Sequence, residues 1–106
     1  MRLIVGLIAV LSIANVAAAC DRDAAHKVQD ALRGLAQIKE QGDRVSYTWG
    51  PAWDNWTDER RLRMTRAAAD ADACLTSTAR DIRFYANGRL VGVASPSGGI
   101  RLTLEK

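Results

Sequence analysis

Histidine and cysteine are scarce in this chain of 106 residues, which contains one histidine, His26, and two cysteines, Cys20 and Cys74. Structural zinc needs four ligands, usually Cys or His at short spacings, and no Cys-x-x-Cys, His-Glu-x-x-His or phosphate-binding glycine motif occurs. His26 falls beside the apolar stripe of a predicted helix, as an ordinary surface histidine does. The sequence therefore predicts no metal site, no cofactor and no catalytic residues, and we expect a protein that is not an enzyme.

The sequence also contains no long run of residues that all carry the same charge. The 15 basic and 12 acidic residues give a formal net charge of +3, and the two signs alternate along the chain. The densest basic group, Arg60, Arg61, Arg63 and Arg66, spreads around most of the circumference of a predicted helix. Because nucleic-acid binding needs a clustered basic surface, we expect no nucleic-acid partner.

The longest apolar run covers residues 3–16, follows the single basic residue Arg2, and leads to alanines at positions 17–19. This pattern is typical of a secretory signal, whereas a membrane span needs about 20 apolar residues. We therefore expect residues 1–19 to be a removed signal peptide and residues 20–106 to form a single exported domain. An N-terminal membrane anchor is disfavoured because Ser12 and Asn15 interrupt the run.

Cys20 directly follows these alanines, and two roles are open for it. Ala17-Ala18-Ala19-Cys20 resembles a bacterial lipobox, although that family prefers leucine where this chain has Ala17. The resemblance implies a lipid anchor at Cys20, and Asp21 would then resemble a signal for retention in the inner membrane. Alternatively, residues 17–19 form an ordinary cleavage site and Cys20 pairs with Cys74 in an oxidising compartment.

Hydrophobic periodicity predicts two helices. From residue 21 to residue 41 apolar side chains recur every three or four positions, and Gly42 follows as a C-cap. Thr57 is the N-cap of a second helix that runs to about Leu75 and has an alanine-rich buried face. If one strand joins two parallel helices, Cys20 and Cys74 lie roughly 24 Å apart, too far for a disulfide. The loop of residues 50–56 could change this separation.

The remaining segments predict strands. Residues 44–49 alternate apolar and polar side chains, and a type I′ turn at Asn87-Gly88 joins residues 81–86 to residues 89–94. With that turn, Phe84 lies opposite Val91 and Ile82 lies opposite Val93. Ile100, Leu102 and Leu104 alternate in a last strand.

This order, α-β-α-β-β-β, predicts an α+β domain. We expect both helices to pack on one face of a small antiparallel sheet of three to four strands, because a sheet this short needs a covering layer.

Aromatic side chains cluster in one short stretch. Four of the six aromatic residues lie between positions 47 and 56, and the loop of residues 50–56 adds polar groups beside them. The cluster either closes the end of the core or forms a recognition surface, since exposed loop aromatics anchor protein or sugar partners. The candidate binding residues are Tyr47, Trp49, Trp53, Asp54, Asn55 and Trp56.

These observations lead to one expected function and two alternatives. We expect an exported, lipid-anchored bacterial cell-envelope protein that binds or inhibits another envelope protein through the aromatic loop. The alternatives are a small periplasmic domain that binds wall polysaccharide and a soluble, disulfide-bonded secreted domain. A thiol-active role for Cys74 is disfavoured by its position on a buried helix face.

Overall fold

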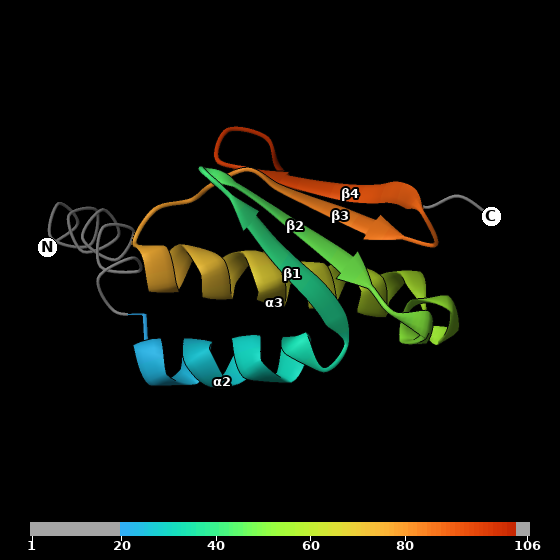
Figure 1. Cartoon of the computed structure of the whole chain (residues 1–106), viewed down its shortest axis with the longest axis horizontal. Helices are drawn as coiled ribbons and strands as arrows, with labels where there is room; N and C mark the ends of the chain where they lie inside the picture. Colours follow the sequence, from blue (N-terminus) through green and yellow to red (C-terminus); the bar gives the residue numbers. More distant parts are fainter. Residues whose placement is uncertain (1–19, 104–106) are drawn as a thin grey trace, which may run out of the picture.

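The computed structural model describes residues 20–103, so the predicted signal peptide and Leu104 lie outside the described range. The described chain contains two α-helices, one 3₁₀-helix and five strands (Figure 1). They are α2 (Arg22–Arg33), β1 (Ala36–Gln41), β2 (Arg44–Trp49), η1 (Pro51–Asn55), α3 (Asp58–Thr76), β3 (Ile82–Ala86), β4 (Arg89–Ser95) and β5 (Gly99–Leu102). The predicted α+β class is confirmed.

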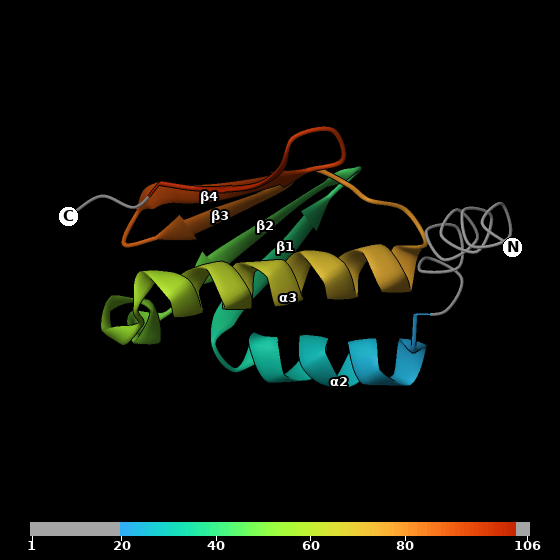
Figure 2. The same cartoon turned by 180° about the vertical axis from the view of Figure 1, so that it is seen from behind.

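The strands form one sheet in the order β1-β2-β3-β4-β5. Both helices lie on the same side of this sheet, and α2 runs antiparallel beside α3 (Figures 1 and 2). We call the side that the helices cover the inner face and the opposite side the outer face. No element of residues 20–103 covers the outer face.

The prediction of one helix over residues 21–41 is wrong in its second half. Helix α2 ends at Arg33, and residues 36–41 form strand β1, which pairs with β2. Leu35 and Ile38 are three residues apart, a spacing that suits a helix, but Ile38 also alternates with polar neighbours as a strand residue does. Gly42 is not a helix cap; it has φ +64° in the tight turn between β1 and β2. The sheet therefore has five strands rather than three to four.

The sheet is mixed, whereas we expected a purely antiparallel one. Strands β2 and β3 pair in parallel, and the three other pairs are antiparallel. A parallel pair needs a long crossover, and η1 with α3 provides it by returning the chain to the end of the sheet where β2 begins.

Helix α3 begins and ends close to the predicted positions. The Thr57 hydroxyl accepts a hydrogen bond from the Arg60 amide at 3.1 Å, as an N-cap should. The helix runs from Asp58 to Thr76, and Ser77 follows in the left-handed conformation with φ 61°. The buried face contains Ala68 and Ala71, as predicted.

The hairpin between β3 and β4 has the predicted turn but a different register. Asn87 and Gly88 both have positive φ, as a type I′ turn requires. A bulge after Phe84 then shifts the pairing, so that Phe84 lies opposite Gly92 and Ile82 opposite Ala94 rather than Val91 and Val93.

The shifted register places small residues beside large ones on the inner face. Phe84 is completely buried there, and small residues lie opposite both large side chains. A Cβ at position 92 would lie only 2.6 Å from Leu102 Cδ2. The predicted last strand is present as residues 99–102, with Ile100 and Leu102 half-buried.

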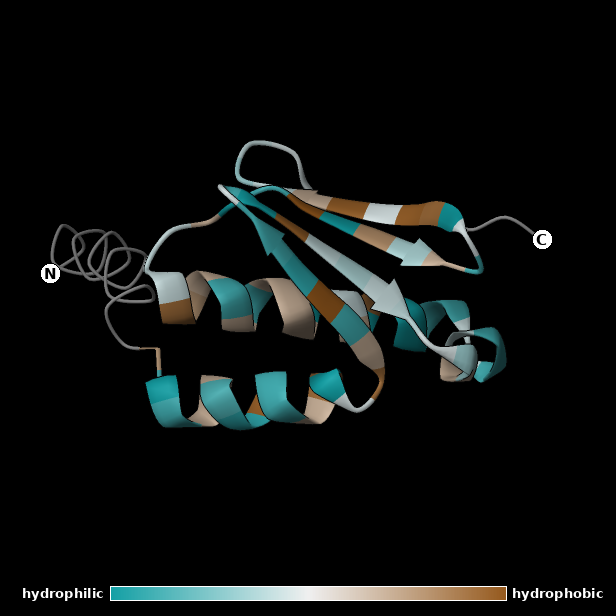
Figure 3. Ribbon diagram, viewed as in Figure 1, coloured by the Kyte–Doolittle hydropathy of each residue, from teal (hydrophilic) through white to brown (hydrophobic). Residues whose placement is uncertain are grey.

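The core lies between the inner face and the helices. Its buried members are Leu32, Val45, Tyr47, Trp49, Trp53, Ala68, Ile82, Phe84, Ala86 and Ala94. Strand β4 is largely hydrophobic, whereas α2 and β1 at the other side of the molecule are largely hydrophilic (Figure 3). Four of these buried residues are aromatic, and they share the cluster with the small Ala68 of α3.

Candidate functional site

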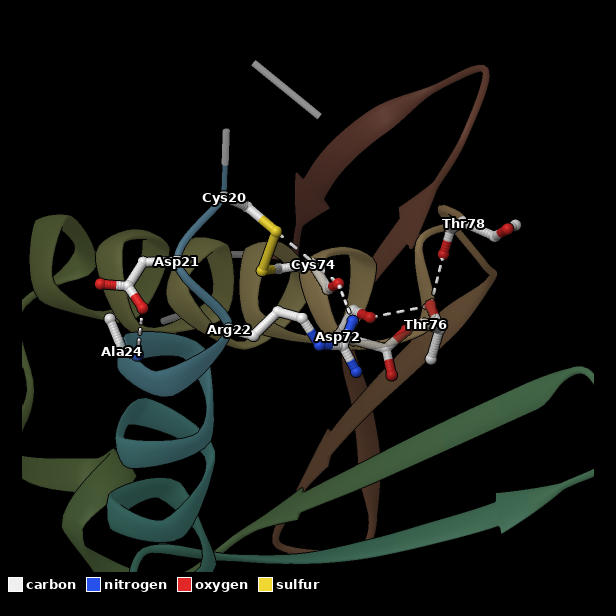
Figure 4. The surroundings of a disulfide bond; sticks show 8 residues. All are labelled: Cys20, Asp21, Arg22, Ala24, Asp72, Cys74, Thr76 and Thr78. Carbon is white, nitrogen blue, oxygen red and sulfur yellow. Dashed lines mark hydrogen bonds between the residues drawn. A yellow bond between two sulfur atoms is a disulfide. The ribbon is translucent and has the colours of Figure 1, made fainter. Parts of the chain in front are cut away.

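A disulfide joins Cys20 to Cys74 (Figure 4). The two Cα atoms lie 5.8 Å apart, so the expectation of roughly 24 Å from parallel helices is wrong. Strand β1 adds a chain reversal, which makes α2 antiparallel to α3 and brings the start of α2 beside the last turns of α3. The Arg22 guanidinium also donates to the Cys74 carbonyl oxygen at 3.2 Å across the same junction.

In the described structure Cys20 has the second of the two roles that the sequence left open, the pairing with Cys74. A lipobox cysteine carries its diacylglycerol on the sulfur atom, and here that sulfur is bonded to Cys74. The described structure therefore has no free thiol in residues 20–103 that could be lipidated or react as a nucleophile.

The aromatic cluster lies mainly in the core. Tyr47, Trp49 and Trp53 are 0%, 3% and 4% exposed, and Trp49 stacks on Trp53 with ring centroids 5.9 Å apart. Trp56 meets Trp49 edge-on at 5.4 Å and is half-buried. In this conformation three of the four rings cannot reach a partner, whereas Trp56 is partly exposed.

The polar residues of the same segment are exposed but are held in place. Asp54 accepts a hydrogen bond from the Asn87 amide at 2.8 Å, which ties η1 to the β3–β4 turn. Arg61 lies over the Trp53 ring at 4.7 Å and donates to the Trp53 carbonyl oxygen at 3.0 Å. Of the predicted binding residues, Asp54, Asn55 and Trp56 therefore form the accessible part.

Two buried polar atoms of the core have no hydrogen-bond partner among the described residues, the Tyr47 hydroxyl and the Trp49 indole nitrogen. Burial raises the pKa of the Tyr47 phenol above its ordinary value of 10.0. The Gln29 side-chain amide lies close enough to lower the same pKa, although it does not meet the geometry of a hydrogen bond, and the Asp72 carboxylate raises the pKa. The phenol is therefore neutral in the folded protein, because burial disfavours the charged phenolate.

An ion pair that the sequence did not predict lies next to this phenol. Asp72, whose side chain is 4% exposed, accepts two hydrogen bonds from Arg80, at 3.1 Å from Nε and 2.7 Å from Nη2. These bonds raise the pKa of Arg80 above its ordinary value. Glu40 of β1 lies 3.5 Å from the same guanidinium. The cluster ties α3 to the sheet, and the pairing of the buried Asp72 carboxylate with Arg80 fits a structural role.

A different surface, on the outer face, presents free polar groups. Outward-facing side chains of β1, β2 and β3 enclose a shallow depression of about 210 Å³, which we call the cationic hollow. It is lined by Lys39, Gln41, Arg44, Val45, Ser46, Asp81, Arg83 and Tyr85.

The sheet register positions these groups. Lys39 lies opposite Ser46 in β1 and β2, and Ser46 lies opposite Arg83 in β2 and β3. A hydrogen bond from the Val45 amide to the Asp81 carbonyl oxygen at 3.3 Å holds Asp81 at the rim. Sequence reasoning missed this site because Lys39 was assigned to a helix and because adjacency across strands is invisible without the register. The one signal in the sequence was that polar side chains alternate with apolar ones along the predicted strands, which places the polar set on the outer face.

Metal clusters and membrane-spanning helices are absent from the described residues. Within residues 20–103 no group of three or more His, Cys, Asp or Glu side chains is placed to hold a metal ion. Neither described helix is long and apolar enough to cross a membrane. Comparisons with protein-family models, with curated proteins and with solved structures found no match.

Proposed function

We propose that this protein is an exported, disulfide-bonded domain of the cell envelope that acts without catalysis, by binding another envelope component through the outer face of its sheet. The observation that carries this proposal is the cationic hollow. Lys39, Arg44 and Arg83 are exposed there, and none of the three forms an ion pair with another described residue.

The disulfide supports the proposal that the protein is exported. Disulfides persist in oxidising compartments and are rare in the cytoplasm of ordinary cells. A bond that closes a loop of about 50 residues stabilises a fold by a few kcal/mol, which matters for a domain this small. The N-terminal residues 1–19 have the pattern of an export signal, which gives the same compartment independently of the disulfide.

The outer face suits binding better than the aromatic loop does. Burial of Tyr47, Trp49 and Trp53 leaves one half-exposed ring in that loop. The outer face instead presents a whole sheet surface that no described element covers. The predicted partners, an envelope protein or a wall glycan, remain the proposed partner classes.

Site-specific photo-crosslinking in the native cells tests this function. A photoreactive amino acid replaces Thr48, an exposed outer-face residue that lies opposite Tyr85. The control replaces Arg63, an exposed residue of α3. We expect a covalent adduct with an envelope component at position 48 and none at position 63. Equal labelling at both positions, or no adduct at position 48, would overturn the proposal.

A further inference from the structure

We propose that the cationic hollow holds one acidic saccharide unit, a sugar that carries a carboxylate or phosphate group, within an envelope polysaccharide. This inference rests on the proposed function, because it assumes that the outer face is the binding surface. It adds the chemical class of the ligand and the residues that recognise it.

Charge gives the first reason. The hollow is lined by three cationic side chains, Lys39, Arg44 and Arg83, and by one acidic residue, Asp81. The excess of positive charge favours an anion, and the guanidinium fork of arginine fits the two oxygens of a carboxylate or phosphate. Because these cations have no ionic partner in the described chain, an incoming anion breaks no internal ion pair.

The spacing of the cations gives the second reason. Lys39 and Arg83 lie on either side of Ser46, one strand away in each direction. Since neighbouring strands are about 4.8 Å apart, their backbones are separated by roughly 10 Å. The long side chains of Lys39 and Arg83 can reach across this distance to the same anionic group above Ser46. The Ser46 hydroxyl can then donate a hydrogen bond to that group.

The other lining groups favour a sugar over an acidic peptide. The half-exposed ring of Tyr85 offers a surface against which a sugar ring can pack. The Gln41 amide and the Asp81 carboxylate can accept hydrogen bonds from sugar hydroxyls. Asp81 would repel the closely spaced carboxylates of an acidic peptide, whereas a sugar presents hydroxyls beside its single charge.

The size of the hollow limits the ligand to one unit. Pockets for drug-sized molecules measure about 300–1,000 Å³, and this depression measures about 210 Å³. It is also open to solvent on the outer face, so a polymer chain can continue across the sheet on both sides of the bound unit. Binding to a single unit is therefore expected to be weak and to gain strength from repeated units.

Titrations of the disulfide-bonded domain, residues 20–106 expressed with an export signal, test the inference by changes in backbone amide NMR signals. The probes are tetragalacturonate, mannose 6-phosphate, neutral maltotetraose and hexaglutamate. We expect shifts centred on Ser46, Arg83 and Tyr85 with at least one of the two anionic sugar probes. Which of these two binds distinguishes a carboxylate sugar from a phosphate sugar. We expect no shifts there with maltotetraose, and weaker binding when the salt concentration rises.

A matched pair of variants localises the site. R44Q/R83Q removes two cations from the hollow, and R63Q/R66Q removes the same charge from the exposed surface of α3. The first variant is expected to weaken binding by at least about tenfold, as loss of charge-assisted hydrogen bonds does, and the control by less than about twofold. Both exchanges lie on the surface, so circular dichroism should show both variants folded.

Three results would overturn the inference. They are the absence of binding by both anionic probes, equal or tighter binding of hexaglutamate, and equal weakening in the two variants. A photo-crosslink at position 48 together with failure of both anionic probes would reject the saccharide while leaving the proposed binding face intact. Failure of the crosslink would instead remove the binding face itself.

Discussion

Asp72 and Arg80 form a two-point ion pair, 3.1 and 2.7 Å long, between the buried side of α3 and the segment that leads into β3. The carboxylate is almost completely buried, while the guanidinium keeps 16% of its side-chain surface exposed. Such a pair fixes how α3 lies against the sheet, because moving either partner leaves a buried charge unpaired.

The first prediction follows from this geometry. Replacing Asp72 by alanine should lower the free energy of unfolding by about 3 kcal/mol, since it leaves the Arg80 guanidinium without its main partner. Urea unfolding of the variant measures the change. D70A, an exposed exchange on the same helix, should stay within about 0.5 kcal/mol of the parent. Equal losses in the two variants would show that the ion pair does not hold α3 in place.

The second prediction concerns the Tyr47 hydroxyl, which is buried without a hydrogen-bond partner. Y47F should be as stable as the parent protein or more stable, because it removes an unsatisfied polar group from the core. Y85F, a half-exposed outer-face exchange, serves as the control. A loss of more than about 1 kcal/mol in Y47F would show that the hydroxyl has a stabilising partner.

The raised pKa of Tyr47 leads us to expect that the domain loses stability at alkaline pH. Its pKa is raised above 10.0 in the folded state, so the unfolded chain ionises first as the pH rises. The neutral Tyr47 phenol therefore makes its full contribution to the free energy of unfolding below about pH 10. That contribution is lost as the pH rises through the folded-state pKa. Y47F should remove this part of the alkaline decline in thermal unfolding. An unchanged decline in the variant would contradict the assignment to Tyr47.

A further prediction concerns the aromatic cluster. Trp53 is 4% exposed and stacks on Trp49, whereas Trp56 is half-buried. W53A should therefore lower the free energy of unfolding by about 3–5 kcal/mol, and W56A by only about 1–2 kcal/mol. Chemical denaturation followed by circular dichroism measures both. The reverse order would mean that Trp53 lies at the surface, as a recognition loop would place it.

The bulged register can be tested at Gly92. A Cβ there would lie 2.6 Å from Leu102 Cδ2 and 3.2 Å from the Arg101 carbonyl oxygen. G92A should therefore destabilise the domain by about 1–3 kcal/mol. G34A, where the nearest atom to an added Cβ is 3.4 Å away, should be neutral or slightly stabilising. A neutral G92A would indicate that Val91, not Gly92, lies opposite Phe84.

Local signals in the sequence were sufficient for part of this fold. Thr57 and the Asn87-Gly88 turn act through contacts with their immediate neighbours, so their residue types alone predicted the start of α3 and the hairpin. The error at β1 arose because Ile38 lies three positions after Leu35, as a helix requires, and two positions after Ala36, as a strand requires, and so short a stretch does not separate the two patterns. That one error also reversed the expected direction of α2 and separated Cys20 from Cys74.

The candidate site was predictable only in part. Which loop aromatic is buried depends on the space left by the alanines of α3, a property of the packed core rather than of the loop. The cationic hollow depends on Lys39, Ser46 and Arg83 being neighbours on three strands, which needs both the antiparallel pairing of β1 with β2 and the parallel pairing of β2 with β3. No spacing along the chain encodes that adjacency.

The most direct test of the account is the intact mass of the protein purified from its native envelope, measured before and after reduction. An exported, disulfide-bonded domain predicts a chain that lacks residues 1–19, carries no lipid, and gains two hydrogen atoms on reduction as the Cys20–Cys74 bond opens. A chain that begins at Cys20 and carries a diacylglycerol on its sulfur would contradict the account, because that sulfur would then be unable to pair with Cys74.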